Sequence, residues 1–127
     1  MDRTAYISLP VRDLDAATAF FTALGFAFDA RVRDENTACL VLGTGALVML
    51  QKTAYFERFT GGPVADPSTK EVSVGLSAVS REEVDDLVDR AVAAGGKDAG
   101  RQDMGVMYMR AFLDIDGHRW SFLHVAN

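Results

Sequence analysis

Two stretches of the chain share one order of hydrophobic and polar positions. Each begins with strand-like residues, over Thr4–Val11 and over Glu71–Ala78. Apolar residues at helical spacing then follow: in the first stretch Leu14, Ala17, Phe20, Phe21 and Leu24, in the second Val84, Leu87, Val88, Ala91 and Val92. The change from a period near two to a period near 3.6 predicts a β-strand that leads into an amphipathic helix.

Both predicted helices carry signals for their ends. Asp13 precedes the first apolar stripe and is a good N-cap, while Ser80 with Glu83 has the spacing of a capping box. Gly25 and Gly95 follow the last apolar positions, and glycine is the residue that most readily takes the left-handed conformation at a helix end. We therefore expect each helix to stop at its glycine.

Three further strand-like segments follow each helix. They cover roughly Phe28–Arg33, Thr37–Leu42 and Leu47–Gln51 in the first half, and Lys97–Ala99, Val106–Leu113 and Arg119–Val125 in the second. The turns of the last hairpins are "GTGA" and "DIDG". Both halves thus read βαβββ, and such repetition is a strong fold signal. We predict an α+β fold in one domain, 1–127, with a first module over about 4–51 and a second over about 71–127.

The segment between the modules, residues 52–70, is predicted to be a connecting loop. Two glycines and two prolines favour irregular structure there. It also holds an aromatic cluster, made of Tyr55, Phe56 and Phe59. This cluster is compatible with a short helix packed on the core and equally with a flap over a pocket.

Composition limits the classes of function. With 127 residues, of which 49% are hydrophobic, the chain can bury a substantial core. Its 13 basic residues are outnumbered by 18 acidic ones and form no cluster, which argues against a nucleic-acid partner. The single cysteine, Cys39, excludes an internal disulfide and lies in an apolar strand, so we expect an inert thiol. With neither a signal peptide nor a membrane span in the pattern, we expect a cytoplasmic protein without membrane contact.

The motifs "LPVRDLDAATAFFTALGF", "VML", "VGLSAVSREEVDDLVDRAVAAGG" and "FLDIDGHRWSF" resemble the vicinal oxygen chelate superfamily, which includes glyoxalase I, extradiol dioxygenases and bleomycin-resistance proteins. The resemblance covers nearly the whole chain. One departure is Ile115, where the family usually has proline in its Asp-Pro-Asp-Gly turn. The resemblance implies two βαβββ modules whose curved mixed sheet forms a concave cavity, and it implies a homodimer.

In the enzymes of this superfamily, four residues on the concave face hold a divalent metal. Carried over by position, these four fall on Tyr6, Met49, Ser73 and Ser121. A phenol, a thioether and two hydroxyls are poor ligands for such ions, which prefer imidazole, carboxylate or carbonyl donors. We therefore predict no metal and no cofactor. Glu71 is the only carboxylate expected near the site, and alone it would bind a metal poorly.

Strand alternation predicts which side chains share the concave face. A "DIDG" hairpin with Gly117 in the left-handed conformation pairs Ala111 with Ser121, and this register turns His118 and His124 towards the helix, as structural or surface histidines. The predicted cavity residues are Tyr6, Ser8, Met49, Gln51, Ser73, Met107, Met109 and Ser121, joined by Leu47, Ala111 and Leu123. Methionines make an adaptable lining that suits an apolar ligand, although the same residues also serve simply to fill a core.

Three functions follow as hypotheses. The first is binding of a small apolar or aromatic molecule without metal, for sequestration or resistance. The second is an enzyme, either a metal-dependent lyase of the lactoylglutathione-lyase type or a dioxygenase with a shifted metal site, or one that uses a metal-free acid–base route with Tyr6 as the proton donor. The third is a structural dimer with no ligand. The sequence leaves open whether the chain is an enzyme.

Overall fold

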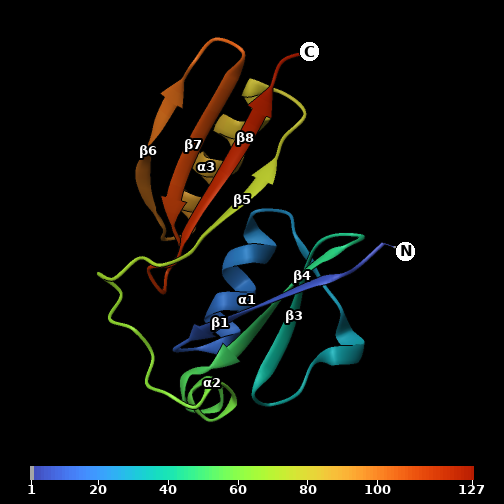
Figure 1. Ribbon diagram of the computed structural model, residues 1–127, viewed down its shortest axis with the longest axis vertical. Helices are drawn as coiled ribbons and strands as arrows, with labels where there is room; N and C mark the ends of the chain where they lie inside the picture. Colours follow the sequence, from blue (N-terminus) through green and yellow to red (C-terminus); the bar gives the residue numbers. More distant parts are fainter. Residues whose placement is uncertain (1) are drawn as a thin grey trace. The chain divides into compact units, whose positions relative to one another are not determined.

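The computed structural model describes residues 2–127, which form two compact units that meet in sequence between Asp66 and Pro67 (Figure 1). The first unit contains β1 (Ala5–Val11), α1 (Leu14–Ala23), β2 (Ala27–Phe28), the 3-10 helix η1 (Ala30–Val32), β3 (Thr37–Gly43), β4 (Ala46–Lys52) and α2 (Thr53–Thr60). The second contains β5 (Ser73–Ser77), α3 (Arg81–Ala93), β6 (Lys97–Asp103), β7 (Met107–Leu113) and β8 (Arg119–Val125). The predicted α+β fold with two βαβββ modules is confirmed.

Each unit is built on a four-stranded mixed sheet of equivalent topology. The strand orders are β1-β4-β3-β2 and β5-β8-β7-β6. In both sheets the first strand pairs in parallel with the last, and the other neighbours pair antiparallel. The first strand of each unit is therefore an edge strand. The helix that follows it leads the chain to the strand at the opposite edge of the sheet.

One face of each sheet packs against a helix and forms the core of its unit. In the first unit this core consists of Leu9, Val11, Leu40, Val48 and Leu50 with Leu14, Ala17, Phe20 and Phe21 of α1. In the second it consists of Val74, Phe112, Trp120 and Phe122 with Val84, Val88 and Ala91 of α3. Since successive strand residues point to opposite faces, the residues between these buried ones lie on the other face of each sheet.

The helix ends follow the sequence prediction. The Asp13 carboxylate accepts a hydrogen bond from the backbone N–H of Ala16, and the Ser80 hydroxyl accepts one from the backbone N–H of Glu83. The Glu83 carboxylate reaches back to the backbone N–H of Val79, one residue before the position expected for a capping box. Gly25 and Gly95 take positive φ angles of 97° and 112°.

Two predicted strand boundaries were wrong. Residues 28–33 do not continue as a strand, because the Asp29 carboxylate accepts hydrogen bonds from the backbone and side chain of Arg31 and stabilises η1. In the connecting segment 52–70 the aromatic cluster lies on the short helix α2, one of the two alternatives expected for it, and this helix contacts β1 and β4. The strand predicted at residues 97–99 extends to Asp103, past a bulge between Asp98 and Arg101.

The "DIDG" turn is organised around Asp114, whose side chain is only 6% exposed. Its carboxylate accepts hydrogen bonds from the backbone N–H groups of Asp116 and His118 and from the indole N–H of Trp120, each at 2.9 Å. Burial raises the pKa of Asp114, although these bonds and the nearby His118 oppose the shift. Gly117 is left-handed, at φ 86°, as expected.

Candidate functional site: the helix-free sheet faces

The first helix-free face is the side of the first sheet opposite α1. It carries four of the predicted cavity residues, Tyr6, Ser8, Met49 and Gln51. The register places Tyr6 beside Leu47, Ser8 beside Met49, and Pro10 beside Gln51. Tyr6 is 66% exposed, whereas Ser8 and Met49 are half-buried. The face is thus mainly apolar, with a phenol at one end and an amide at the other.

Gln51 stands out on this face because it is buried without being satisfied. Its side chain is 5% exposed, and within residues 2–127 its Oε1 atom has no hydrogen-bond partner. An unsatisfied buried acceptor costs about 1–3 kcal/mol, and most buried polar groups avoid this cost. Gln51 pairs in register with Thr37 and Pro10, whose positions place it between β3 and β1.

Cys39 also lies on the first helix-free face, opposite Met49 in the β3–β4 register. It is 1% exposed, and burial raises the pKa of its thiol. A buried thiol with a raised pKa is a poor nucleophile, because the thiolate is the reactive form. The structure therefore supports the sequence expectation of an inert thiol.

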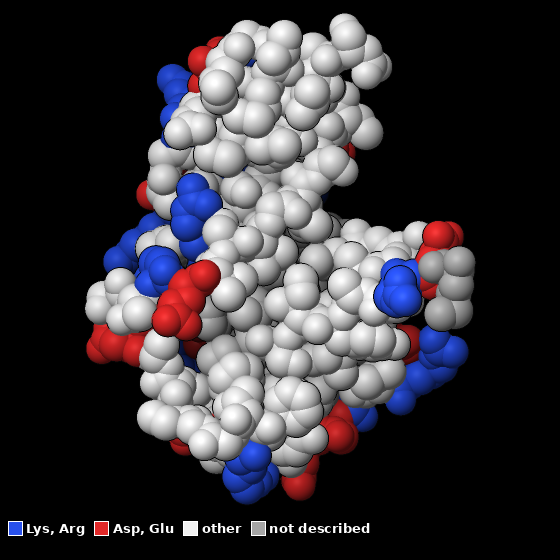
Figure 2. Space-filling view, viewed as in Figure 1, with Lys and Arg blue, Asp and Glu red and all other residues white. Residues whose placement is uncertain are grey.

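The second helix-free face is the side of the second sheet opposite α3. The predicted register is confirmed, since Ala111 pairs with Ser121 and Phe112 with Trp120. This register places the remaining predicted cavity residues, Ser73, Met107, Met109 and Ser121, on one face together with Gly75, Ala111 and Leu123. Figure 1 shows this face turned to the viewer with α3 behind the sheet. In Figure 2 the same face is mostly white.

Sequence reasoning missed one charged side chain on this face. Arg119 pairs with Ser73 in the β5–β8 register, and its Nη1 group donates a 2.6 Å hydrogen bond to the Ser73 hydroxyl. Its parity with Ser121 was the available signal, because residues two apart on a strand share a face. Glu71, the carboxylate expected near the site, is exposed and precedes β5.

The positions that the family resemblance assigns to a metal do not fit one. Within each unit the two positions share a face: Tyr6 with Met49, and Ser73 with Ser121. They offer no imidazole or carboxylate, and the hydroxyl of Ser73 already accepts a hydrogen bond from a cation. Among residues 2–127, no three His, Cys, Asp or Glu side chains are grouped so that they could hold a metal ion.

The two histidines lie outside these faces. The Nδ1 atom of His124 is 3.0 Å from the carbonyl oxygen of Ala78, and His124 pairs in register with Tyr108, which faces α3. His118 belongs to the turn before β8, where its backbone N–H donates to Asp114. The prediction that both serve structure is compatible with these contacts.

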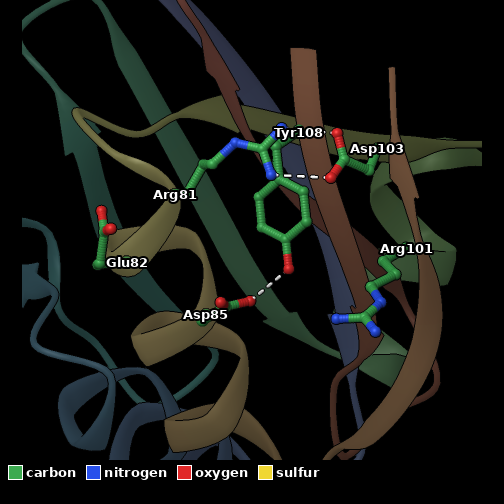
Figure 3. Close-up of a pocket in the computed structure, with 6 residues that line it drawn as sticks. All are labelled: Arg81, Glu82, Asp85, Arg101, Asp103 and Tyr108. Atoms are coloured by element: carbon green, nitrogen blue, oxygen red, sulfur yellow. Dashed lines mark hydrogen bonds and ion pairs between the residues drawn. The ribbon is translucent and has the colours of Figure 1, made fainter. Parts of the chain in front are cut away.

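A separate groove of about 470 Å³ lies on the helix side of the second unit. Figure 3 shows its lining, in which the guanidinium of Arg81 lies over the ring of Tyr108 and pairs with Asp103. This ion pair and the backbone N–H of Gly105 lower the pKa of Asp103 to about 2. The Tyr108 hydroxyl donates to Asp85 at 2.6 Å and, with Arg110, lowers the pKa of that carboxyl. The groove is therefore largely an ion-pair network between α3 and the sheet.

The family model for the Glyoxalase/Bleomycin resistance protein/Dioxygenase superfamily matches residues 3–122. The chain belongs to this superfamily. Its fold is that of several solved structures, among them a hypothetical protein, SA1046, from S. aureus, with 28% identity and a TM-score of 0.84 over 98% of this chain and 95% of that one. No curated protein matches the sequence.

Two further superfamily structures share the fold at lower identity. A family enzyme from Burkholderia phytofirmans PsJN has 19% identity and a TM-score of 0.82, over 97% of this chain and 98% of that one. A bleomycin resistance determinant encoded on the transposon Tn5 has 21% identity and a TM-score of 0.67, over 96% and 97%. Within residues 2–127, no helix is long and apolar enough to cross a membrane.

Proposed function

We propose that this superfamily member binds a small apolar or aromatic molecule on its helix-free sheet faces, without a protein-held metal, as a sequestering or resistance protein does. The observation that carries the proposal is Gln51, a buried amide whose Oε1 lacks a partner on a face lined by methionine and aliphatic side chains. A ligand with an N–H or O–H group would supply the missing donor once the Gln51 side chain turns towards the surface, because Oε1 is fully buried in this conformation. Few polar groups on an apolar surface are typical of small-molecule sites.

The same residue gives the proposal a direct test. Replacing the amide in Gln51→Met removes the unsatisfied acceptor, so we expect the ligand-free protein to gain about 1–3 kcal/mol of stability against urea. Gln102 is an exposed glutamine on β6, and Gln102→Met should leave stability within about 0.5 kcal/mol. An increase in stability for Gln51→Met but not for Gln102→Met would support the proposal that the Gln51 oxygen is kept, at a cost in stability, to accept a hydrogen bond from a ligand.

Binding is tested with indole and 1-methylindole, which differ in one N–H donor. The wild-type protein should show a larger thermal shift with indole, because a ligand that binds the folded state stabilises it. In Gln51→Met this preference for indole should disappear. Equal shifts for the two compounds, or none across a wider set of aromatic molecules, would contradict the proposal. So would stoichiometric zinc, nickel, manganese or iron whose removal by a chelator lowers stability.

We also propose that the chain acts as one domain within a homodimer. Light scattering after size exclusion measures the mass, which is 13.8 kDa for one chain. A monomeric mass across the micromolar range would contradict the dimer without affecting the binding proposal.

A further inference from the structure

We propose that the second helix-free face recognises the carboxylate of a small organic acid through Arg119, with the apolar part of the acid extending along the face towards Met109 and Leu123. This inference rests on the proposed function, to which it adds the charge of the ligand and its direction on the sheet. It also gives a role to a residue that the family resemblance does not mark.

Positive charge gathers at one end of this face. The strand registers place four residues in one row across the sheet, Lys97, Leu113, Arg119 and Ser73. Two of them are cations and none is acidic, although the chain carries a net charge of −5.

The acidic residues of the same sheet face the other way. Asp98 and Asp103 of β6 pair with Arg110 and Arg81 on the helix side. Arg110 is additionally bonded to Asp85 and Asp89 of α3. These carboxylates therefore neutralise Arg81 and Arg110 on the helix side of the sheet. Within residues 2–127, Arg119 forms no ion pair with a carboxylate. Glu71 is exposed and does not contact Arg119 through an ion pair.

The guanidinium of Arg119 is held with one edge available. Its Nη1 group is bonded to Ser73, while Nε and Nη2 have no partner among the described residues. These two groups form the edge that takes a carboxylate in a bidentate fork. The chain shows the same fork elsewhere: Nε and Nη2 of Arg31 bond to the two carboxylate oxygens of Asp29 at 3.0 and 2.8 Å. Arg119 thus presents the donors that a carboxylate requires.

Beyond the cationic row, the face suits a flat apolar body. The next row holds only small residues, Ala111, Ser121 and Gly75. Gly75 is exposed, whereas Ala111 and Ser121 are buried. A Cβ atom at position 75 would lie only 3.3 Å from the Ser121 hydroxyl oxygen, so glycine avoids a tight contact there and keeps this row low. Met109 and Leu123 lie in the middle of the row after that, flanked by Ser77 and Gln102, about 13 Å from Arg119 at the usual rise per strand residue. A two-ring aromatic acid spans much of this distance.

The arrangement also accounts for the disagreement with the metal-binding pattern of the superfamily. Ser73 occupies a position that the resemblance assigns to a metal ligand, and here it binds a guanidinium. A divalent cation at that position would be repelled by the fixed charge of Arg119. The positive charge near Ser73 is therefore supplied by the protein itself, and it favours an anionic ligand.

The test compares aromatic acids with their neutral amides. Benzoate and 2-naphthoate are titrated against benzamide and 2-naphthamide, and amide chemical shifts of the ¹⁵N-labelled protein report affinity and location. We expect the wild type to prefer the acids at least about tenfold, since a hydrogen bond to a charged group contributes about 1.5–3 kcal/mol. The largest shifts should fall on Ser73, Arg119 and Ser121, and raising the salt concentration should weaken binding of the acids.

Matched variants separate charge from position. Arg119→Gln should abolish the preference for acids, and Arg119→Lys should retain only part of it, because lysine lacks the planar fork. Arg101→Gln removes the same charge from an exposed arginine on the helix side of the same sheet, so it should leave the preference unchanged.

The outcomes distinguish this inference from the proposed function. If the amides bind the wild type as tightly as the acids, or if Arg119→Gln keeps the preference, the inference is overturned and small-molecule binding stands. If acids and amides both fail to bind anywhere on the protein, the inference falls together with the proposed function.

Discussion

The hydrogen bond between Asp114 and Trp120 is predicted to fix β8 in its register. Trp120 is fully buried on the helix side, stacked on Phe112 with ring centroids 6.4 Å apart, and its indole N–H donates to the Asp114 carboxylate at 2.9 Å. Replacement by Asp114→Asn keeps an oxygen for the two backbone N–H groups of the turn. It can, however, present an NH₂ group to the indole N–H, so that a buried donor is left without an acceptor.

The expected magnitude follows from that unsatisfied donor. A buried N–H without a partner costs about 1–3 kcal/mol, a large part of the 5–15 kcal/mol that stabilises a typical domain. Other consequences of Asp114→Asn, such as loss of the buried charge, contribute equally whether or not the indole is present. A double-mutant cycle with Trp120→Phe therefore isolates the pair, and we expect a coupling energy of about 1–3 kcal/mol.

The assay is urea unfolding of the wild type, the two single variants and the double variant. Unfolding is followed by far-UV circular dichroism, because Trp120 is the only tryptophan of the chain and its replacement removes the tryptophan fluorescence signal. Asp114→Asn should destabilise the wild type more than it destabilises Trp120→Phe. A coupling energy below about 0.5 kcal/mol would refute the reasoning, since independent sites add within that margin. An unchanged unfolding slope m across the cycle shows that the denatured state is comparable in all four.

Three further predictions concern the second unit. Arg81→Met should raise the pKa of Asp103 from about 2 towards its ordinary 3.8, as measured by NMR titration of the carboxyl carbon. Because the pKa is lower in the folded state, the stabilisation by this ion pair is present above pH 3.8 and is lost as the pH falls through about 2. Gly117→Ala should destabilise by at least about 1–2 kcal/mol in urea, since φ is +86° and the new Cβ would lie 3.0 Å from Pro67; a neutral effect would contradict this. Ser80→Ala should cost about 1 kcal/mol through loss of the helix cap, whereas Ser80→Asp should restore it.

The sequence was sufficient for those features that depend on local periodicity. The helices α1 and α3, the Asp13 and Ser80 caps and the β7–β8 register follow from apolar spacing and from the turn glycine, and these were predicted correctly. The failures have local causes that periodicity does not report. The bidentate contact of Arg31 with Asp29 converts a strand-like segment into η1, and the bulge after Asp98 lets β6 continue beyond its glycine.

The candidate site was predicted only in part, because a register gives the face of a side chain and not its partners. The predicted register placed Ser73 and Ser121 on one face, as found. The register could not indicate that the Gln51 amide oxygen lacks a donor, because that depends on every neighbour of the residue. Arg119 is not among the metal-ligand positions of the family, although its parity with Ser121 places it on the same face.

The strict alternation along β8 has a consequence for how such a protein can change. Trp120 and Phe122 hold the strand to α3, while Arg119 and Ser121 lie on the opposite face of the sheet, where Ser121 is buried and Arg119 is half-buried. Mutation can therefore exchange recognition groups on one side of the strand while the other side keeps the unit folded. Adaptation to a new ligand then requires no compensating change in the interior, and a library randomised at the outward positions should remain largely soluble and foldable.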